Sequence, residues 1–400
     1  MKILVLPSFY PNSYDPLVGV FFQDHALALQ TAGHDVIVLA VLPISLIEIW
    51  KQKKFSFGLS RKQDKGMITY LFQFPAVPKL RWVNNVLRLF IGWHLYRLIC
   101  HKHGSPDLVH VHCFSAGILA RKIKRRDAVP YAITEHDAVF ALGLLSYTQK
   151  KLALNVFREA LVRMAVSEQF VKLLKCQYGL PFLYIPNPVS AFDFPELPLA
   201  RINKKNGQII RVCHVARLHA EKRQDRLIRA FSSMVKCYSD AELHIAGAGP
   251  EREKLESLVL ELGLERQVTF HGMLPRREVF QLMHSCDLFA LSSDYETFGV
   301  VLIEAMVCGL PVMATRCGGP ESIITAEWMG LLTMKDDSSF AQGLLDIAKR
   351  VQDNRFDSDR ISVHAQTTYS CETIGKRMTE LLVHAISKSK SAKAAARTLS

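Results

Sequence analysis

Short apolar runs alternate with longer amphipathic segments along most of the chain. In the first half, apolar runs of the length of buried strands cover residues 3–6, 36–41, 108–112, 131–134 and 164–166. Segments with the 3.6-residue repeat of an amphipathic helix lie between them. This alternation predicts a parallel β-sheet covered by helices on both faces, because parallel strands need long crossover connections and are buried on both sides.

The alternation is interrupted once and then resumes. Residues 188–208 hold three prolines and the polar run Asn203–Gly207, a composition typical of a linker. Apolar runs return at 209–215, 242–246, 267–270, 288–291 and 311–314. We therefore predict an α/β protein with two doubly wound Rossmann-like domains, at 1–187 and 209–372, and expect the active site in the cleft between them.

Both ends of the chain add expectations. We predict a helix at 373–387, for which packing back towards the first domain is one option, and a disordered tail rich in Lys, Ala and Ser at 388–400. The run at 3–6 is too short for a signal peptide, and no apolar stretch of about 20 residues predicts a transmembrane helix. The nine cysteines form no C-x-x-C pair. Reduced thiols and a cytoplasmic protein are therefore expected.

The first half of the chain is rich in basic residues. The hydrophobic fraction of 49% and the charged fraction of 22% are those of a globular protein, but the net charge is +13. Residues 1–200 carry most of the excess, with 23 basic and 13 acidic side chains. The segment 79–97 mixes basic and aromatic residues at helical spacing, and further basic clusters lie at 51–54 and 121–126. This pattern favours peripheral docking on an anionic membrane, with packing of 79–97 on the sheet as the alternative.

Candidate chemistry is densest at Ser293–Ala305, which follows an apolar run and opens a helix. A helix N-terminus presents N–H groups and a positive dipole to an anion, and Gly299 allows close approach of a ligand. Glu296 precedes the helix, and Glu304 lies inside it among apolar residues, where a vicinal diol would supply two donors. Alternatively, Glu296 caps the helix and Glu304 is solvated. A second glycine loop with a carboxylate, Cys317–Glu321, follows the next apolar run and favours a nucleotide-sugar pocket.

These motifs together resemble those of the retaining group 1 glycosyltransferases of family four, which have the GT-B fold. The resemblance covers nearly the whole chain and includes Glu296 and Glu304 at their spacing, the Gly309–Val312 segment and the following Gly-Gly-Pro-Glu. Further matching segments lie at 187–189, 216–222 and 247–251.

The resemblance implies roles for residues of the second domain. Arg217 and Lys222 would bind the donor diphosphate, and two fixed cations can stabilise a departing diphosphate. Glu304 would bind the ribose hydroxyls. Glu296 would hold the donor sugar and phosphate together with the backbone N–H groups of three residues, Phe298, Gly299 and Val300. The segment after residue 270 would lie near the base through Gly272 and Met273.

Two residues of the first domain complete the expected site. His136 follows an apolar run and would face the donor sugar, although a structural loop histidine is the alternative. Gly19 resembles the family's glycine near the donor phosphate, but Val18 stands where the family often has a second glycine. The resemblance thus implies catalysis by His136 together with the cations and carboxylate of the second domain, and it implies neither a metal nor a cofactor.

We therefore expect a retaining transferase that moves a hexose-type sugar from a UDP- or GDP-sugar to a saccharide acceptor, lipid-linked in cell-surface polysaccharide or glycolipid synthesis. The diphosphate would leave on the face that the acceptor approaches and would take its proton. The alternatives are a 2-epimerase-like enzyme of the same fold and a non-catalytic nucleotide-binding protein, whereas nucleic acid is disfavoured by the site's carboxylates. A dehydrogenase is disfavoured, because this chain lacks the third glycine of the dinucleotide-binding fingerprint after Gly247 and Gly249.

Two further motifs are set aside. Asp357-Ser358-Asp359 has the D-x-D pattern of metal-dependent glycosyltransferases, but it lies in a polar stretch and is interpreted as a solvated turn. The histidines at 101, 103, 110 and 112 match no recognised metal-site spacing, and packing or surface roles are expected for them.

Overall fold

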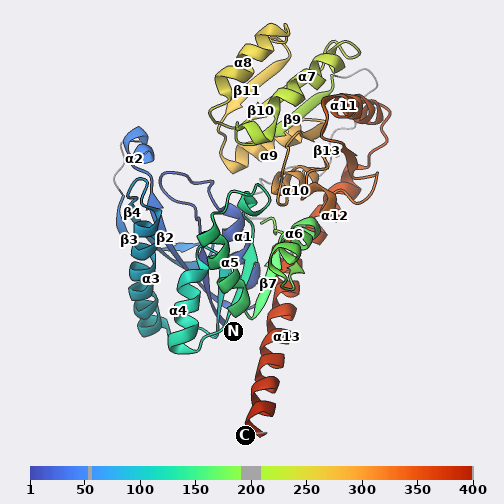
Figure 1. Cartoon of the computed structure of the whole chain (residues 1–400). Helices are drawn as coiled ribbons and strands as arrows, with labels where there is room; N and C mark the ends of the chain where they lie inside the picture. Colours follow the sequence, from blue (N-terminus) through green and yellow to red (C-terminus); the bar gives the residue numbers. More distant parts are fainter. Residues whose placement is uncertain (53–55, 191–208, 399–400) are drawn as a thin grey trace. The chain divides into compact units, whose positions relative to one another are not determined.

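The computed structural model describes residues 1–52, 56–190 and 209–398 and divides the chain into two compact units (Figure 1). The first unit comprises 1–166, 171–188 and the C-terminal segment from Cys371. The second comprises 167–170 and 189–370. Most of the predicted linker, residues 191–208, lies outside the described residues.

The first unit is built on an eight-stranded sheet with the order β3-β4-β2-β1-β5-β6-β7-β8. Its strands are β1 Lys2–Pro7, β2 Asp35–Ile44, β3 Gly58–Asp64, β4 Met67–Pro75, β5 Leu108–His112, β6 Tyr131–Glu135, β7 Val162–Ala165 and β8 Leu183–Tyr184. All neighbours pair in parallel except β3 and β4, an antiparallel hairpin. Both residues of its turn, Lys65 and Gly66, have positive φ, as a type I′ hairpin turn requires.

Helices cover both faces of this sheet, because alternate residues of each buried strand point to opposite sides. The helices are α1 Val20–Thr31, α2 Leu46–Gln52, α3 Arg81–His103, α4 Gly117–Asp127, α5 Tyr147–Glu159 and α6 Glu168–Tyr178. On one face Ile3 and Val5 join the core formed with α1, while Leu6 and Leu39 face α3 and α4.

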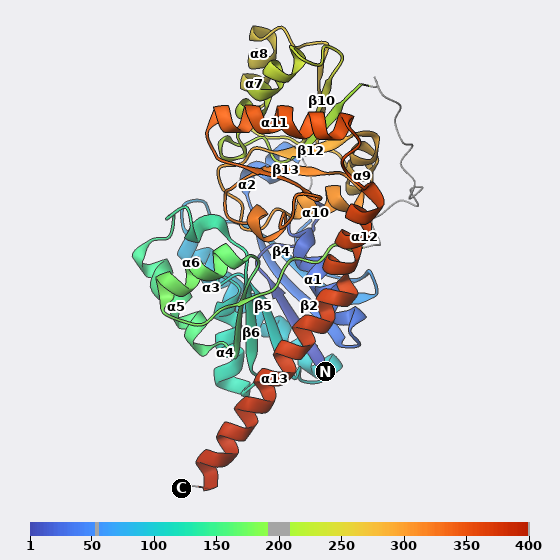
Figure 2. The ribbon, with the colours of Figure 1, turned by 90° about the vertical axis from the view of Figure 1, so that its right-hand side faces the viewer.

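The C-terminal helix α13, Cys371–Thr398, packs alongside α1 of the first unit (Figure 2). Met378 and Leu382 are buried in the same core as α1, and a Cβ on Gly375 would lie 2.0 Å from the carbonyl oxygen of Ala28. The helix continues beyond the predicted end at residue 387 into the segment predicted to be disordered. Ala and Lys, which are frequent there, are strong helix formers, and this explains the difference.

The second unit holds a six-stranded parallel sheet with the order β11-β10-β9-β12-β13-β14. Its strands are β9 Arg211–Val215, β10 Glu242–Ala246, β11 Val268–Gly272, β12 Leu288–Leu291, β13 Val312–Thr315 and β14 Gly330–Thr333. Its helices are α7 Gln224–Val235, α8 Arg252–Glu261, α9 Arg276–Ser285, α10 Val300–Val307, α11 Asp337–Gln352 and α12 Ser358–Tyr369. The strand order reverses between β9 and β12, and ligands of such sheets bind at this switch point.

Two features of the second unit bear on the sequence motifs. A Cβ on Gly247 would lie 1.8 Å from the carbonyl oxygen of Ala216, so this glycine lets the turn after β10 support the loop after β9. Asp357 is the N-cap of α12 and accepts a hydrogen bond from the N–H of Arg360, so the D-x-D segment begins a helix rather than forming a turn. None of the described helices is both long and apolar enough to cross a bilayer.

Candidate functional site

The loops that follow β9 and β12 meet through an ion pair at the switch point. The Nζ of Lys222, at the end of a short 3-10 helix, lies 2.7 Å from Oε1 of Glu296. The hydroxyl of Ser293 donates to the same oxygen at 2.7 Å. The exposed fractions of the Lys222 and Glu296 side chains are only 17% and 13%. Because both partners use Oε1, the second carboxylate oxygen is available to a ligand.

A buried arginine holds the β12–α10 loop in place. Arg226 on α7 is 3% exposed, and its guanidinium donates to the carbonyl of Ser292 and to the carboxylates of Asp294 and Asp337 at 2.9–3.0 Å. A fully paired guanidinium is a strong, directional anchor. The network therefore ties the loop that carries Glu296 to helices α7 and α11. Sequence reasoning missed Arg226, because its partners are 66 to 111 residues further along the chain.

The glycine loop after β13 packs directly on the Glu296 loop. The N–H of Gly319 donates to the carbonyl of Glu296 at 2.8 Å, and a Cβ at Gly319 would lie 2.3 Å from the Cα of Phe298. Glu321 accepts a hydrogen bond from the N–H of Gly318 at 2.9 Å. The two predicted glycine loops are thus brought together, and the Glu321 carboxylate stabilises its own loop.

Helix α10 begins next to this loop. Gly299 is its N-cap with φ 99°, a conformation that favours glycine, and Val300 is its first residue. The first N–H groups of a helix lack intrahelical partners, so those near Val300 can bind an anion. The side chain of Phe298 is buried at 1% exposure, so this residue can offer a ligand only its backbone.

The predicted ribose-binding carboxylate already has a protein partner. Oε1 of Glu304 accepts a hydrogen bond from Nε of Arg276 at 3.1 Å and forms an ion pair with Nη2 at 3.0 Å, and both side chains are more than four-fifths buried. Sequence reasoning missed Arg276, which lies 28 residues before its partner. Both nitrogens approach Oε1, so Oε2 of Glu304 remains for a hydroxyl group.

The other predicted residues of the second unit are more exposed. Arg217 lies in the loop after β9, its carbonyl accepts a hydrogen bond from Gln224, and its exposed guanidinium forms no ion pair with the residues that the structure describes. Gly272 ends β11 with φ 70°, and Met273 after it is 61% exposed. Arg217 therefore offers an uncompensated positive charge.

In the first unit Gly19 is the N-cap of α1 with φ 70°. A Cβ there would lie 2.9 Å from the carbonyl carbon and oxygen of Phe9, so no larger residue fits without a shift of the backbone. His136 follows β6 and is 7% exposed. Its Nε2 lies 3.0 Å from Nδ1 of His112, and its Nδ1 is buried with no hydrogen-bond partner among the described residues.

His136 belongs to a cluster of four buried histidines. His25, His110 and His112 are fully buried, and neighbouring rings of the cluster lie 4.3–6.3 Å apart. Burial lowers the pKa of His25 to about 4 and that of His110 to about 3, and it holds the pKa values of His112 and His136 well below the usual range. The four rings are therefore neutral near pH 7.

The histidines grouped by sequence separate in the structure. His101 is exposed and His103 contacts the hydroxyl of Tyr70, whereas His110 and His112 join the buried cluster. The signal that sequence reasoning missed is His25 on α1. Among the described residues, no group of three or more His, Cys, Asp or Glu side chains is arranged to hold a metal ion.

Beside β6, the buried carboxylate of Glu135 accepts hydrogen bonds from three N–H groups, those of Phe114, His136 and Asp137, at 2.9–3.1 Å. Burial raises its pKa to about 7. These bonds fix the loop that carries His136, and Glu135 therefore supports the loop from within.

Comparisons with known proteins agree with this geometry. Residues 18–188 match the family model "Glycosyl transferase 4-like domain", and residues 199–355 match "Glycosyl transferases group 1". An uncharacterized glycosyltransferase of Methanocaldococcus jannaschii is 36% identical over 325 residues, covering 73% of this chain and 82% of its own. A Bacillus subtilis protein named for teichuronic acid biosynthesis is 27% identical over 364 residues, covering 86% and 88%.

The fold also matches a solved structure. HepE of Anabaena, in complex with UDP-glucose, superposes with a TM-score of 0.71 at 20% identity, covering 96% of this chain and all of that one. Together with the two sheets of mainly parallel strands, this likeness confirms the predicted GT-B fold.

The buried histidines predict a specific acid sensitivity. In the unfolded chain their pKa is about 6.5, so below that pH the unfolded state binds protons that the folded state does not. Their contribution to stability is intact above about pH 6.5 and is lost as the pH falls towards 4. His110→Gln should flatten the dependence of the unfolding free energy on pH by up to about 1.4 kcal/mol per pH unit, measured by urea unfolding between pH 7 and 5. The exposed control His101→Gln should keep the parental slope. Equal slopes for both variants would contradict the assignment.

Proposed function

The chain belongs to the group 1 glycosyltransferases, and from this premise we propose that it is a retaining hexosyltransferase that uses a UDP- or GDP-sugar. The observation that carries the proposal is the Lys222–Glu296 ion pair at the switch point of the second sheet. It supplies a fixed cation for a diphosphate beside a carboxylate oxygen for a sugar hydroxyl. The UDP-glucose bound in HepE supports UDP as the first donor to test.

The donor would be held by charge and by hydroxyl recognition. Arg217, Lys222 and the N-terminus of α10 neutralise the diphosphate, since cations and helix N–H groups both favour anions. Oε2 of Glu296 accepts a hydrogen bond from a sugar hydroxyl, and Oε2 of Glu304 does the same for the ribose. Gly272 and the exposed Met273 lie beside the base.

Transfer would proceed on one face of the sugar. The bond between the anomeric carbon and the diphosphate breaks as the acceptor oxygen bonds to that carbon from the same side, and the departing phosphate takes the acceptor's proton. Arg217 and Lys222 stabilise the negative charge that develops on the leaving group. His136, which the resemblance places at the donor sugar, has its Nε2 beside His112 and its Nδ1 buried. The cations thereby supply the stabilisation that a metal ion gives elsewhere.

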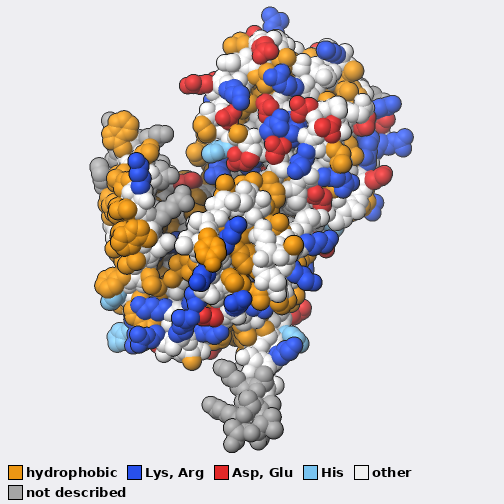
Figure 3. Space-filling view, in the orientation of Figure 1, with side chains coloured by type: hydrophobic (Ala, Val, Ile, Leu, Met, Phe, Trp, Pro, Cys, Tyr) orange, Lys and Arg blue, Asp and Glu red, His pale blue; other side chains and the backbone are white. Residues whose placement is uncertain are grey.

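The acceptor would be a saccharide carried on a lipid. The two halves of α3 differ in solvent exposure. Tyr96 and Ile99 in the second half are buried against the sheet. In the first half, one stripe of the helix is 56–67% exposed and consists of Trp82, Val86 and Phe90. The helix contains no acidic residue. Figure 3 shows hydrophobic and basic side chains together along the edge of the first unit that carries α2 and α3. A basic, aromatic helix face of this kind supports docking on an anionic membrane.

Donor turnover tests the catalytic assignment. We expect wild-type protein to be stabilised by one class of UDP-, GDP- or ADP-sugar in a thermal-shift panel, and to hydrolyse or transfer that donor with EDTA present. Arg217→Ala should lower kcat about 100-fold, as expected for loss of one transition-state charge partner, without lowering the melting temperature. The matched control Arg229→Ala, an exposed arginine on α7, should keep full activity. Activity that EDTA abolishes and Mg²⁺ restores, or interconversion of the free nucleotide sugar without transfer, would contradict the proposal, as would binding without turnover.

Vesicle binding tests the docking face. The double variant Trp82→Ser/Phe90→Ser should lose at least tenfold in affinity for vesicles that contain anionic lipid, measured by co-sedimentation at low salt. Burial of two large aromatic side chains contributes several kcal/mol at most. Loss of even part of this energy should weaken vesicle binding measurably. Leu260→Ser, at a residue of the second unit that is 62% exposed, should bind as the parent does. Vesicle binding that changes neither with the double substitution nor with the salt concentration would argue against membrane docking through this face.

A further inference from the structure

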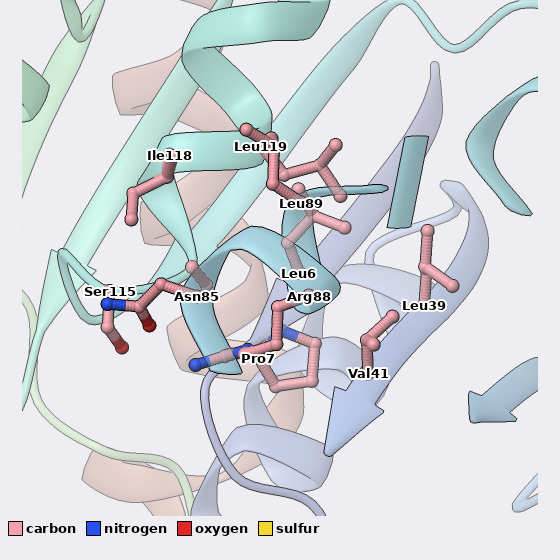
Figure 4. A pocket seen from close by; sticks show the side chains of 11 residues that line it. Leu6, Pro7, Leu39, Val41, Asn85, Arg88, Leu89, Ser115, Ile118 and Leu119 are labelled. Atoms are coloured by element: carbon pink, nitrogen blue, oxygen red, sulfur yellow. The ribbon is translucent and has the colours of Figure 1, made fainter. Parts of the chain in front are cut away.

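A pocket lies on the face of the first unit's sheet that is covered by α3 and α4 (Figure 4). Leu6 and Pro7 of β1 and Leu39 and Val41 of β2 form its sheet side. Its enclosed part is small, with about 30 Å³ open to the centre of a water molecule, and the rest opens to solvent. Pro7 ends β1, so the pocket reaches the carboxyl edge of the sheet, which also carries Gly19 and His136.

The pocket has a polar side and an apolar side. In Figure 4 the polar groups of Asn85, Arg88 and Ser115 gather on one side, and Leu39 and Val41 lie on the other. The Ser8 hydroxyl donates to the carbonyl of His112, so the Ser115 hydroxyl, 2.6 Å away, donates its proton to Ser8. A ligand that fits this lining carries an acceptor group at one end and an apolar body at the other.

Arg88 is the charged group of the pocket, and its guanidinium forms no hydrogen bond or ion pair with any described residue. Burial lowers its pKa to about 10, so it still carries its charge near neutral pH. The contrast with Arg226 is informative, because that buried guanidinium is bound by two carboxylates and a carbonyl. A partly buried charge without a partner is costly, and an anionic ligand would offset the cost.

The pocket adjoins the exposed stripe of α3. Asn85 and Leu89 line it, and Val86 and Phe90, one position further along the helix, are 56% and 61% exposed. A molecule can thus extend from the pocket onto the stripe. A free phosphate would leave the apolar side of the pocket unused, whereas a lipid phosphate uses both sides.

We propose that this pocket binds the phosphate and the first methylene groups of a lipid phosphate, the anchor of the lipid-linked acceptor. Arg88 pairs with the phosphate, Asn85 donates a hydrogen bond to it, and the chain follows Leu39 and Val41 outward to the aromatic stripe. The identity of this lipid as the acceptor rests on the proposed function, but binding of the lipid phosphate does not.

The test uses octyl phosphate, inorganic phosphate and 1-octanol as probes, with binding followed by calorimetry on the full chain. Wild-type protein should bind octyl phosphate at least tenfold more tightly than it binds either inorganic phosphate or 1-octanol. Arg88→Gln should weaken octyl phosphate binding at least tenfold without lowering the melting temperature, since it removes a charge that has no protein partner. The matched control Arg97→Gln removes a charge from the same helix, where the side chain is 61% exposed and pairs with Asp127, and should change the affinity less than twofold.

Two results would overturn the proposal: unchanged octyl phosphate binding in Arg88→Gln, or inorganic phosphate that binds as tightly as octyl phosphate. Donor hydrolysis measured on the same proteins separates this proposal from the proposed function. Arg88→Gln should keep the wild-type rate of hydrolysis without acceptor, because Arg88 belongs to no part of the donor site. A wild-type protein that binds octyl phosphate but turns over no nucleotide sugar would refute the transferase and leave the pocket standing.

Discussion

The ion pair between Lys222 and Glu296 is the contact on which the candidate site depends. It joins the loops after β9 and β12, the two strands between which the strand order of the second sheet reverses. A largely buried ion pair has a desolvation cost, and it is most stable when further hydrogen bonds and rigid surroundings hold its geometry. Ser293 supplies such a bond to Glu296, and Arg226 fixes the backbone on which both residues lie.

Glycine packing extends this arrangement outward. Gly247 allows the turn after β10 to support the loop of Arg217, and Gly319 allows the loop after β13 to rest on the backbone of Phe298. Larger side chains at these positions would push the loops apart. The cation, the carboxylate and the start of α10 are therefore held by contacts that leave little freedom, as catalysis by preorganised charge requires.

Much of the fold and of the site could be predicted from the sequence, because strand runs, glycine turns and loop carboxylates are local signals. Motifs such as Glu296 and Glu304 at their spacing also indicated the family to which the chain belongs. The partners of those motifs could not be predicted, since Arg226 and Arg276 act across long sequence separations and lie in ordinary amphipathic helices. The β3–β4 hairpin was not predicted: β3 is polar and mostly exposed, whereas β4 is apolar and mostly buried and was overlooked. His25 was missed for the same reason as the arginines: only the packing of α1 brings it to the other histidines.

In the proposed donor site, Lys222, positioned by Glu296, recognises the terminal phosphate of the donor's diphosphate. This recognition is tested most directly by calorimetry on wild-type protein and Lys222→Met. The quantity compared is the ratio of the affinities for the nucleoside diphosphate and the nucleoside monophosphate of the preferred base. We expect a preference for the diphosphate of about tenfold or more in the wild type, in line with a charge-assisted hydrogen bond, and near loss of this preference in the variant. An equal preference in both proteins would contradict it.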